Sequence, residues 1–293
     1  MSLKFIIFTV LFLLILQYPS YASNNIVLTV NESKVYEDEF NRLFNARKKS
    51  YRESLNFNLF SYDSAEIREK RKAYLNKAKK ENIQIEDSDV EVAFDRLKKQ
   101  FKNIDNVLHV ASKHDLSIKD IKNKLKENLT LERYFNKIAK SEVIDLLVTE
   151  KLLVEESDKR GILVYEKEVI SEIEKLKKEK GGLDGFLKYL NANNATITDA
   201  KREIKNKLVF AKVKRDIIKN VPISTEEIQK NYEKYYKKDH IPLEEVKYDI
   251  AKKIKIAKGE KVFNLYLSKL KSSASVIVYN KYLNNYTVSQ KNR

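Results

Sequence analysis

The sequence has 293 residues, a formal net charge of +16 at pH 7 and no cysteine. Without cysteine, a disulfide framework and thiolate metal sites are excluded. Five glycines and three prolines are too few for the many turns of an all-β protein. With 34% charged and 42% hydrophobic residues, the composition suits helices that bury one stripe each. We therefore predict an elongated, mostly helical fold.

Residues 1–22 have the pattern of a secretory signal peptide. Lys4 gives a positive start, residues 5–16 form an apolar core, and Ser20-Tyr21-Ala22 is a small-x-small cleavage site. A helix of that core would be about 18 Å long, well short of a bilayer core of about 30 Å. We expect cleavage after Ala22 and export to the periplasm. Because the sequence lacks cysteine, we expect no lipoprotein anchor.

Residues 23–62 are expected to form a hairpin followed by a helix. Apolar and polar residues alternate over residues 25–35, on either side of Asn31-Glu32-Ser33. Because Glu32 stands where a type I′ turn favours glycine, the sequence predicts a loose loop.

The stretch Leu55 to Tyr62, LNFNLFSY, is apolar and aromatic but has no helical period. The favoured interpretation is a loop packed on the core, because aromatic residues bury a large area when they find a partner. The alternative is an exposed loop that binds client proteins. Under that alternative the candidate contacts are five residues of this segment and three tyrosines near the C-terminus: Leu55, Phe57, Leu59, Phe60, Tyr62, Tyr232, Tyr235 and Tyr236.

Residues 141–224 are predicted to form a unit of four helices. Gly161 and Gly181-Gly182 end the first two helices, since glycine adopts the left-handed conformation at least cost. Thr196 with Asp199 is the N-cap pattern of a long, basic helix.

Residues 63–140 are expected to form a first helical repeat, because their sequence is similar to that of residues 141–224. An offset of 79 positions (162 − 83) aligns residues 75–140 with residues 154–219 without a gap, with 15 identities in 66 positions. Ser117 and Asp120 match the later N-cap, which favours a duplication. The alternative is that two amphipathic stretches of similar composition align through their period alone.

Four segments in and after the second repeat form a distinctive pattern of helices and breakers: LLVTEKLLVEESDKRGILV, EVISEIEKLKKEKGGLDGFLKYL, TITDAKREIKNKLVFAKVKRDII and VPISTEEIQKNYEKYY. This pattern resembles the N-terminal chaperone segment of SurA-type periplasmic folding factors, which is related to the peptide-binding part of trigger factor. The resemblance implies an exported, ATP-independent holdase chaperone. Its partners would be unfolded polypeptides, outer-membrane proteins among them.

Residues 225–280 are expected to form C-terminal helices and a closing strand, and residues 281–293 a polar tail. The family often carries a parvulin prolyl isomerase domain before a sequence like that starting at Ile241. Only residues 237–240 are available there, where a small domain needs about 50 residues. We therefore expect no isomerase activity. The last strand, within residues 274–279, is expected to pair with the first.

We expect no catalytic, metal or cofactor site, because the three histidines lack a metal-ligand spacing and no catalytic motif occurs. The basic residues form rows on the long helices: Lys122, Lys126, Arg133 and Lys137, then Lys201, Lys205, Lys212 and Lys219. Two features argue against nucleic acid as a partner: the expected signal peptide, and the absence of any nucleic-acid recognition motif from the sequence. One interpretation of these rows is a lysine-rich composition that serves solubility only; the other is that they attract acidic unfolded clients or anionic lipid surfaces. The alternative function is a basic structural or surface-binding protein of the cell envelope that associates with anionic lipid or polymer.

Overall fold

The computed structural model of the chain describes residues 25–61 and 63–279. The expected signal peptide, the polar tail and Tyr62 lie outside these residues. The mostly helical fold is confirmed. In chain order the elements are β1 (Ile26–Val30), β2 (Ser33–Tyr36), α2 (Glu37–Glu53), α3 (Ala65–Lys80), α4 (Asp87–Gln100), α5 (Ile104–Ser112), α6 (Ile118–Lys159), α7 (Glu166–Glu179), α8 (Leu183–Ala192), α9 (Ile197–Ile218), α10 (Thr225–Tyr235), η1 (Lys237–Asp239), α11 (Leu243–Ser273) and β3 (Val276–Val278).

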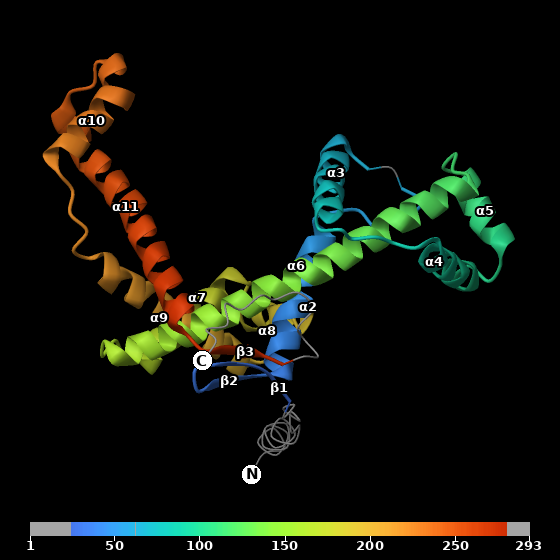
Figure 1. Ribbon diagram of the computed structural model, residues 1–293, viewed down its shortest axis with the longest axis horizontal. Coiled ribbons are helices and arrows are strands. Elements are labelled where there is room, and N and C mark those ends of the chain that lie inside the picture. The colour runs from blue at the N-terminus through green and yellow to red at the C-terminus, as the bar shows by residue number, and fades with distance from the viewer. Residues whose placement is uncertain (1–24, 62, 280–293) are drawn as a thin grey trace, which may run out of the picture.

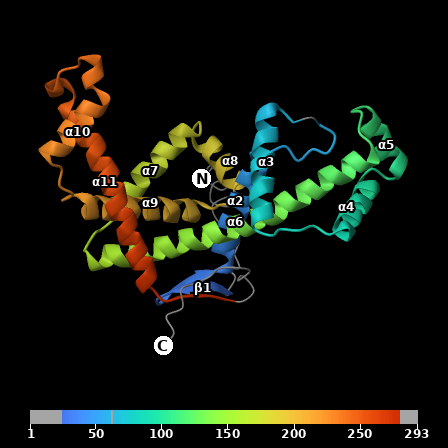
Figure 2. The same cartoon turned by 45° about the horizontal axis from the view of Figure 1, so that its top comes forward.

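Helix α6 forms the axis of the molecule (Figure 1 and Figure 2). Its 42 residues extend over about 63 Å at 1.5 Å per residue. It begins with a capping box, in which the Asp120 amide donates to Ser117 Oγ and the Ser117 amide donates to the Asp120 carboxylate. The expected boundary between residues 140 and 141 falls inside this helix, because no glycine or proline interrupts its sequence there.

A three-stranded antiparallel sheet in the order β2-β1-β3 joins the two ends of the described chain. Leu28 pairs with Val35 on one side and with Val278 on the other, so the predicted pairing of terminal strands is confirmed. The prediction of a loose hairpin loop is wrong, since Val30 pairs directly with Ser33. Asn31 supplies the tight turn by adopting a φ of 52°, which asparagine tolerates better than most residues.

Corresponding helices of the two repeats begin 79 positions apart in the sequence. Helix α4 begins at residue 87 and α7 at 166, α5 at 104 and α8 at 183, and α6 at 118 and α9 at 197. Left-handed residues also recur at this offset: Asn82 and Gly161 precede the first pair, and Asp115 and Asn194 the last. Figure 1 shows α4 and α5 at one end of α6, and α7 to α9 near the other.

Each helical group has its own apolar core. The first buries Val90, Phe94, Leu97, Val107, Ala111 and Ile121. The second buries Val169, Ile173, Phe186, Leu190, Ala200 and Ile204. Another cluster joins the sheet to α2 and the second half of α6, and it includes Leu28, Phe40, Ile144 and Val278. Helix α6 therefore supplies residues to the first and third of these cores, whereas the second is formed by α7, α8 and α9.

Helices α10 and α11 form an arm that lies on the same side of α6 as α3 in both views (Figure 1 and Figure 2). Helix α11 continues without a break through Gly259. A Cβ at Gly259 would lie 3.2 Å from Cδ1 of Ile218, so the missing side chain allows α9 and α11 to approach. Among residues 25–61 and 63–279, we find no helix with the length and apolar character needed to span a membrane.

Candidate functional site

The aromatic segment that follows α2 packs against α3 and α6. Leu55 is buried in a cluster with Phe135 of α6, and Phe57 is half-buried beside it. The rings of Phe57 and Phe135 are 6.4 Å apart, and those of Phe60 and Phe101 are 5.5 Å apart. The structure therefore places the described part of this segment on the core, as the favoured interpretation of the sequence has it.

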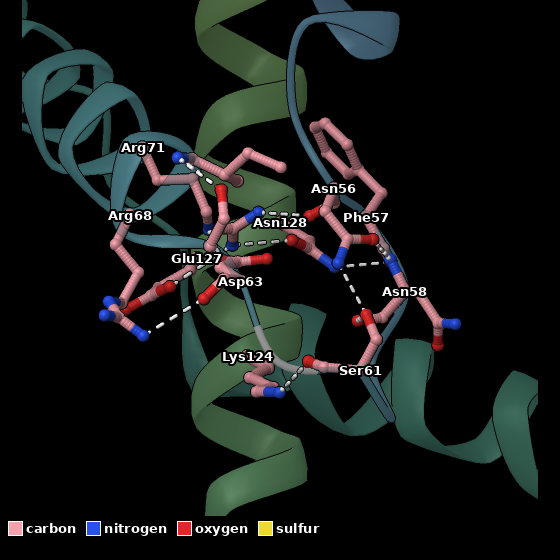
Figure 3. A network of polar contacts seen from close by, with 12 residues as sticks. Asn56, Phe57, Asn58, Ser61, Asp63, Arg68, Arg71, Lys124, Glu127 and Asn128 are labelled. Atoms are coloured by element: carbon pink, nitrogen blue, oxygen red, sulfur yellow. Dashed lines mark hydrogen bonds and ion pairs between the residues drawn. The ribbon is translucent and has the colours of Figure 1, made fainter.

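A network of polar contacts holds this segment in place (Figure 3). The guanidinium of Arg71, which is only 6% exposed, donates to the carbonyl oxygen of Asn56 and to Oδ1 of Asn128, both at 2.8 Å. The ammonium of Lys124 donates to the carbonyl oxygens of Leu59 and Ser61. Because α3 and α6 supply these donors, the segment can neither extend nor leave the core without breaking several hydrogen bonds to charged groups.

Inside the segment, asparagine side chains replace the missing helical hydrogen bonds. Oδ1 of Asn56 accepts from the amide of Asn58, and Oδ1 of Asn58 accepts from the amide of Phe60, both at 3.0 Å. Such side-chain turns satisfy backbone donors in irregular segments. The alternation of asparagine with apolar residues in LNFNLF is the sequence signal for these side-chain turns, and the sequence-based predictions above missed it.

A shallow groove of about 460 Å³ opens between this segment and one face of α2. Leu55 and Phe57 form its apolar part. Its polar rim comes from residues spaced by three or four positions on α2: Asn45, Lys48, Lys49, Arg52 and Glu53. The guanidinium of Arg52 lies 5.1 Å from the centre of the Phe57 ring, so the apolar floor has a cation directly above it.

Acidic residues of α6 fix the position of α2 beside this groove. Glu132 pairs with both Lys48 and Arg52. Burial and the hydrogen bond from its hydroxyl to Glu142, at 2.7 Å, together raise the pKa of Tyr51 to about 12. Burial alone would raise the pKa of Glu142, but hydrogen bonds from Arg47 and Tyr51 outweigh it and lower that pKa. With the pKa of Tyr51 raised and that of Glu142 lowered, the hydrogen bond joins a neutral phenol, as donor, to an ionised carboxylate.

The three tyrosines predicted as further contacts lie elsewhere, on the arm (Figure 1). The hydroxyl of Tyr232 donates to the carbonyl oxygen of Ile241, and the hydroxyl of Tyr236 accepts from Lys253. Tyr235 is 58% exposed. The structure therefore does not bring these tyrosines together with the Leu55 segment, because α10 sits at the tip of the arm.

The basic rows mostly form ion pairs within the helical groups. Arg133 of α6 pairs with Asp89 of α4, and Lys212 of α9 pairs with Glu168 of α7 at the equivalent positions. The remaining pairs are Lys122 with Glu91, Lys126 with Asp87, Lys137 with Glu81, Lys201 with Glu166, and Lys219 with Asp216. These lysines and arginines therefore face carboxylates of neighbouring turns or helices.

The groove is widely open to solvent. It offers an apolar floor, three cations, one carboxylate and the amide of Asn45. Within the part of the chain that the structure describes, no group of histidine, aspartate and glutamate residues could hold a metal ion. The arrangement thus supports reversible binding by burial and hydrogen bonding.

Part of the chain is similar to two foldase proteins named PrsA, from two strains of Clostridium perfringens. Each is 38% identical over 95 residues, which are 31% of this chain and 27% of the foldase. The chain thus matches about a quarter of the length of these curated relatives. No protein-family model and no solved structure matches. The match supports a relationship to a folding factor over that stretch, whereas the SurA-type resemblance stays a prediction.

Proposed function

We propose that the protein is an exported, ATP-independent holdase chaperone that binds unfolded polypeptides of the cell envelope. The partial similarity to foldase proteins supports a role in protein folding. The expected signal peptide at residues 1–22 supports export. A holdase needs apolar surface that is open to long, irregular ligands, and the proposal depends on where such surface lies.

The observation that carries the proposal is the distribution of exposed apolar side chains over the described residues. They lie along several helices, mainly α7, α8, α9 and α11, whereas the groove beside α2 adds only the half-buried Phe57 over the buried Leu55. On α11, Tyr248 is 78% exposed and Leu265 is 60% exposed, and Ile256 lies between them, also exposed. Exposed apolar surface is costly in a protein without a binding partner. Exposed apolar side chains on several separate helices suit a chain that has no defined shape of its own.

We further propose that the chain does not catalyse prolyl isomerisation. Helix α10 ends at Tyr235 and α11 begins at Leu243, and an isomerase domain of about 50 residues does not fit into that connection. A proline-limited refolding assay measures this directly. Catalytic acceleration by substoichiometric amounts of the protein would contradict the proposal.

The test of the chaperone function is suppression of aggregation. The chain without residues 1–22 is mixed with a chemically unfolded envelope protein, and light scattering is followed after dilution. We expect suppression at about equimolar protein. A triple variant, Tyr248→Ser, Ile256→Ser and Leu265→Ser, should suppress aggregation less, because it removes exposed apolar surface from α11 without touching a core.

A matched control replaces three exposed lysines of the same helix, Lys252→Ser, Lys255→Ser and Lys261→Ser. It should retain full suppression. No suppression by the unsubstituted chain at a several-fold excess would refute the proposal. Binding to anionic vesicles combined with no affinity for unfolded chains would instead support the envelope-surface function.

Photo-crosslinking tests the groove beside α2. A photoreactive amino acid at the exposed rim position Asn45 should crosslink to an unfolded client. The same group at Lys72, an exposed position on α3 outside the groove, should crosslink much less. Equal yields at the two positions would show that the groove is not a preferred contact.

A further inference from the structure

A second groove lies where α4, α5 and the first turn of α6 meet, at the end of α6 far from the arm (Figure 1). Its volume is about 490 Å³. Phe94, Ile104 and Ile118 form its apolar part. The remaining lining residues are basic or amide side chains: Lys98, Lys99, Lys102, Lys122 and Asn103.

Two of the lysines are held in place by carboxylates and by the aromatic ring. Lys98 pairs with Asp95, and Lys122 pairs with Glu91, each at 2.6 Å. Both ammonium groups also lie over the ring of Phe94, at 5.4 and 5.1 Å from its centre. These contacts fix two cations beside the apolar floor and largely neutralise them.

The other two lysines lie at the end of α4. Lys99 is in the last turn of α4 and Lys102 follows it, with a left-handed φ of 72°. Both are exposed. Among residues 25–61 and 63–279 the carboxylates of Asp95 and Glu91 pair with Lys98 and Lys122 instead, although the charge of Lys99 also helps to lower the pKa of Asp95. The groove therefore combines an apolar floor with a rim that has two more lysines than paired carboxylates.

Several of these side chains recur at the equivalent positions of α7 to α9. Lys178, Lys201 and Ile197 stand 79 positions after Lys99, Lys122 and Ile118. Gly181 stands at the position of Lys102, so the second helical group carries one lysine fewer there. The cationic rim is thus strongest in the first group.

We propose that this groove binds acidic segments of non-native polypeptides in which an apolar residue adjoins the carboxylates. The inference rests on the proposed chaperone function and assigns it a preferred class of client segment. Carboxylates would pair with Lys99 and Lys102 while the apolar residue covers Ile104 and Ile118. Charge complementarity favours such a segment, because its carboxylates match the excess of lysines on the rim while its apolar residue matches the isoleucines beside them.

The experiment measures binding of fluorescent peptides by anisotropy. The probe is a twelve-residue peptide rich in aspartate and glutamate with one phenylalanine, and its control has glutamine and asparagine at the acidic positions. We expect the acidic peptide to bind more tightly, and added salt to weaken it. The variant Lys99→Glu/Lys102→Glu should lose about tenfold or more in affinity for it, about 1.4 kcal/mol.

The control variant Lys255→Glu/Lys261→Glu changes the net charge equally on α11, where both side chains are exposed. It should bind the acidic peptide within about twofold of the unsubstituted chain, since charges more than a Debye length away are screened. Circular dichroism of both variants checks that the helices are intact.

Equal losses in the two variants would overturn the inference, as would an unsubstituted chain that does not prefer the acidic peptide. It would also be overturned if Lys99→Glu/Lys102→Glu lost binding to phosphatidylglycerol vesicles but kept the peptide. In each case, suppression of aggregation by the unsubstituted chain would leave the proposed function standing. Absence of that suppression is the outcome that counts against the function itself.

Discussion

Replacing Arg71 with methionine tests whether the polar network positions the Leu55 segment. The guanidinium of Arg71 is buried and donates at 2.8 Å to Asn56 and Asn128 and at 3.2 Å to Glu127. It also lies 3.4 Å from the carboxylate of Asp63. Methionine fills much of the same space but leaves these acceptors without their donor. Hydrogen bonds to a charged group contribute about 1.5–3 kcal/mol each and Arg71 donates three, so we expect a loss of about 3–5 kcal/mol.

The matched control is Arg68→Met, one turn earlier on the same helix. Arg68 is exposed and donates to the carbonyl oxygen of Asp63 at 3.0 Å. Because water can replace an exposed donor, this change should cost about 1 kcal/mol or less. Arg71→Lys should lie between the two, since an ammonium keeps the charge but lacks the planar fork of donors.

Urea unfolding followed by circular dichroism gives the free energy of unfolding for each variant. Hydrogen exchange gives the local effect, because the amide of Phe60 is protected by Asn58 within the segment. Its exchange should rise about a hundredfold or more in Arg71→Met, as each 1.4 kcal/mol is a factor of ten. Unfolding energies of Arg71→Met and Arg68→Met within about 0.5 kcal/mol of each other, with unchanged exchange at Phe60, would refute the reasoning.

Three further results are expected. Phe135→Ala should lower the free energy of unfolding by about 3–5 kcal/mol, because this side chain is fully buried among four aromatic rings; a loss below about 1 kcal/mol in urea would contradict that packing. Deleting residues 275–293 should lower the melting temperature far more than deleting residues 280–293, since only the longer deletion removes β3 from the sheet, and equal melting temperatures would disprove the role of that strand. Because the pKa of Tyr51 is raised to about 12 in the folded state from an ordinary 10, its contribution to stability is complete below pH 10 and is lost as pH rises through 12. Tyr51→Phe should reduce this alkaline loss in a urea series from pH 9 to 12, and an unchanged pH profile would count against it.

Local features of this structure could be predicted from the sequence. The N-cap at Thr196 with Asp199 and the left-handed residue at Gly161 lie where the sequence placed them. A cap involves residues three positions apart, so its physics is contained in a few neighbouring residues. The pairing of β1 with β3 was also predictable, because each strand has an apolar side and unpaired backbone groups that need a partner.

The candidate site could be predicted only in part. The Leu55 segment drew attention through its aromatic composition, and its packing on α6 was the favoured interpretation. The contribution of α2 was missed, although Lys48 and Arg52 share a face of an amphipathic helix. Which of several basic faces adjoins an apolar floor depends on how α2 is rotated about its axis against α6. That rotation is set by long-range contacts such as those to Glu132.

The sequence by itself therefore determined the helices, their caps, the repeat spacing of 79 positions and the strands at the two ends. Only the tertiary structure decided that α6 continues through residues 140 and 141, joining two groups that the repeat alignment separates. Only the tertiary structure also showed which lysines form ion pairs with distant helices, such as Lys126 with Asp87. The physical reason is that helix signals are local, whereas the partner of a charged side chain depends on which distant helix lies beside it.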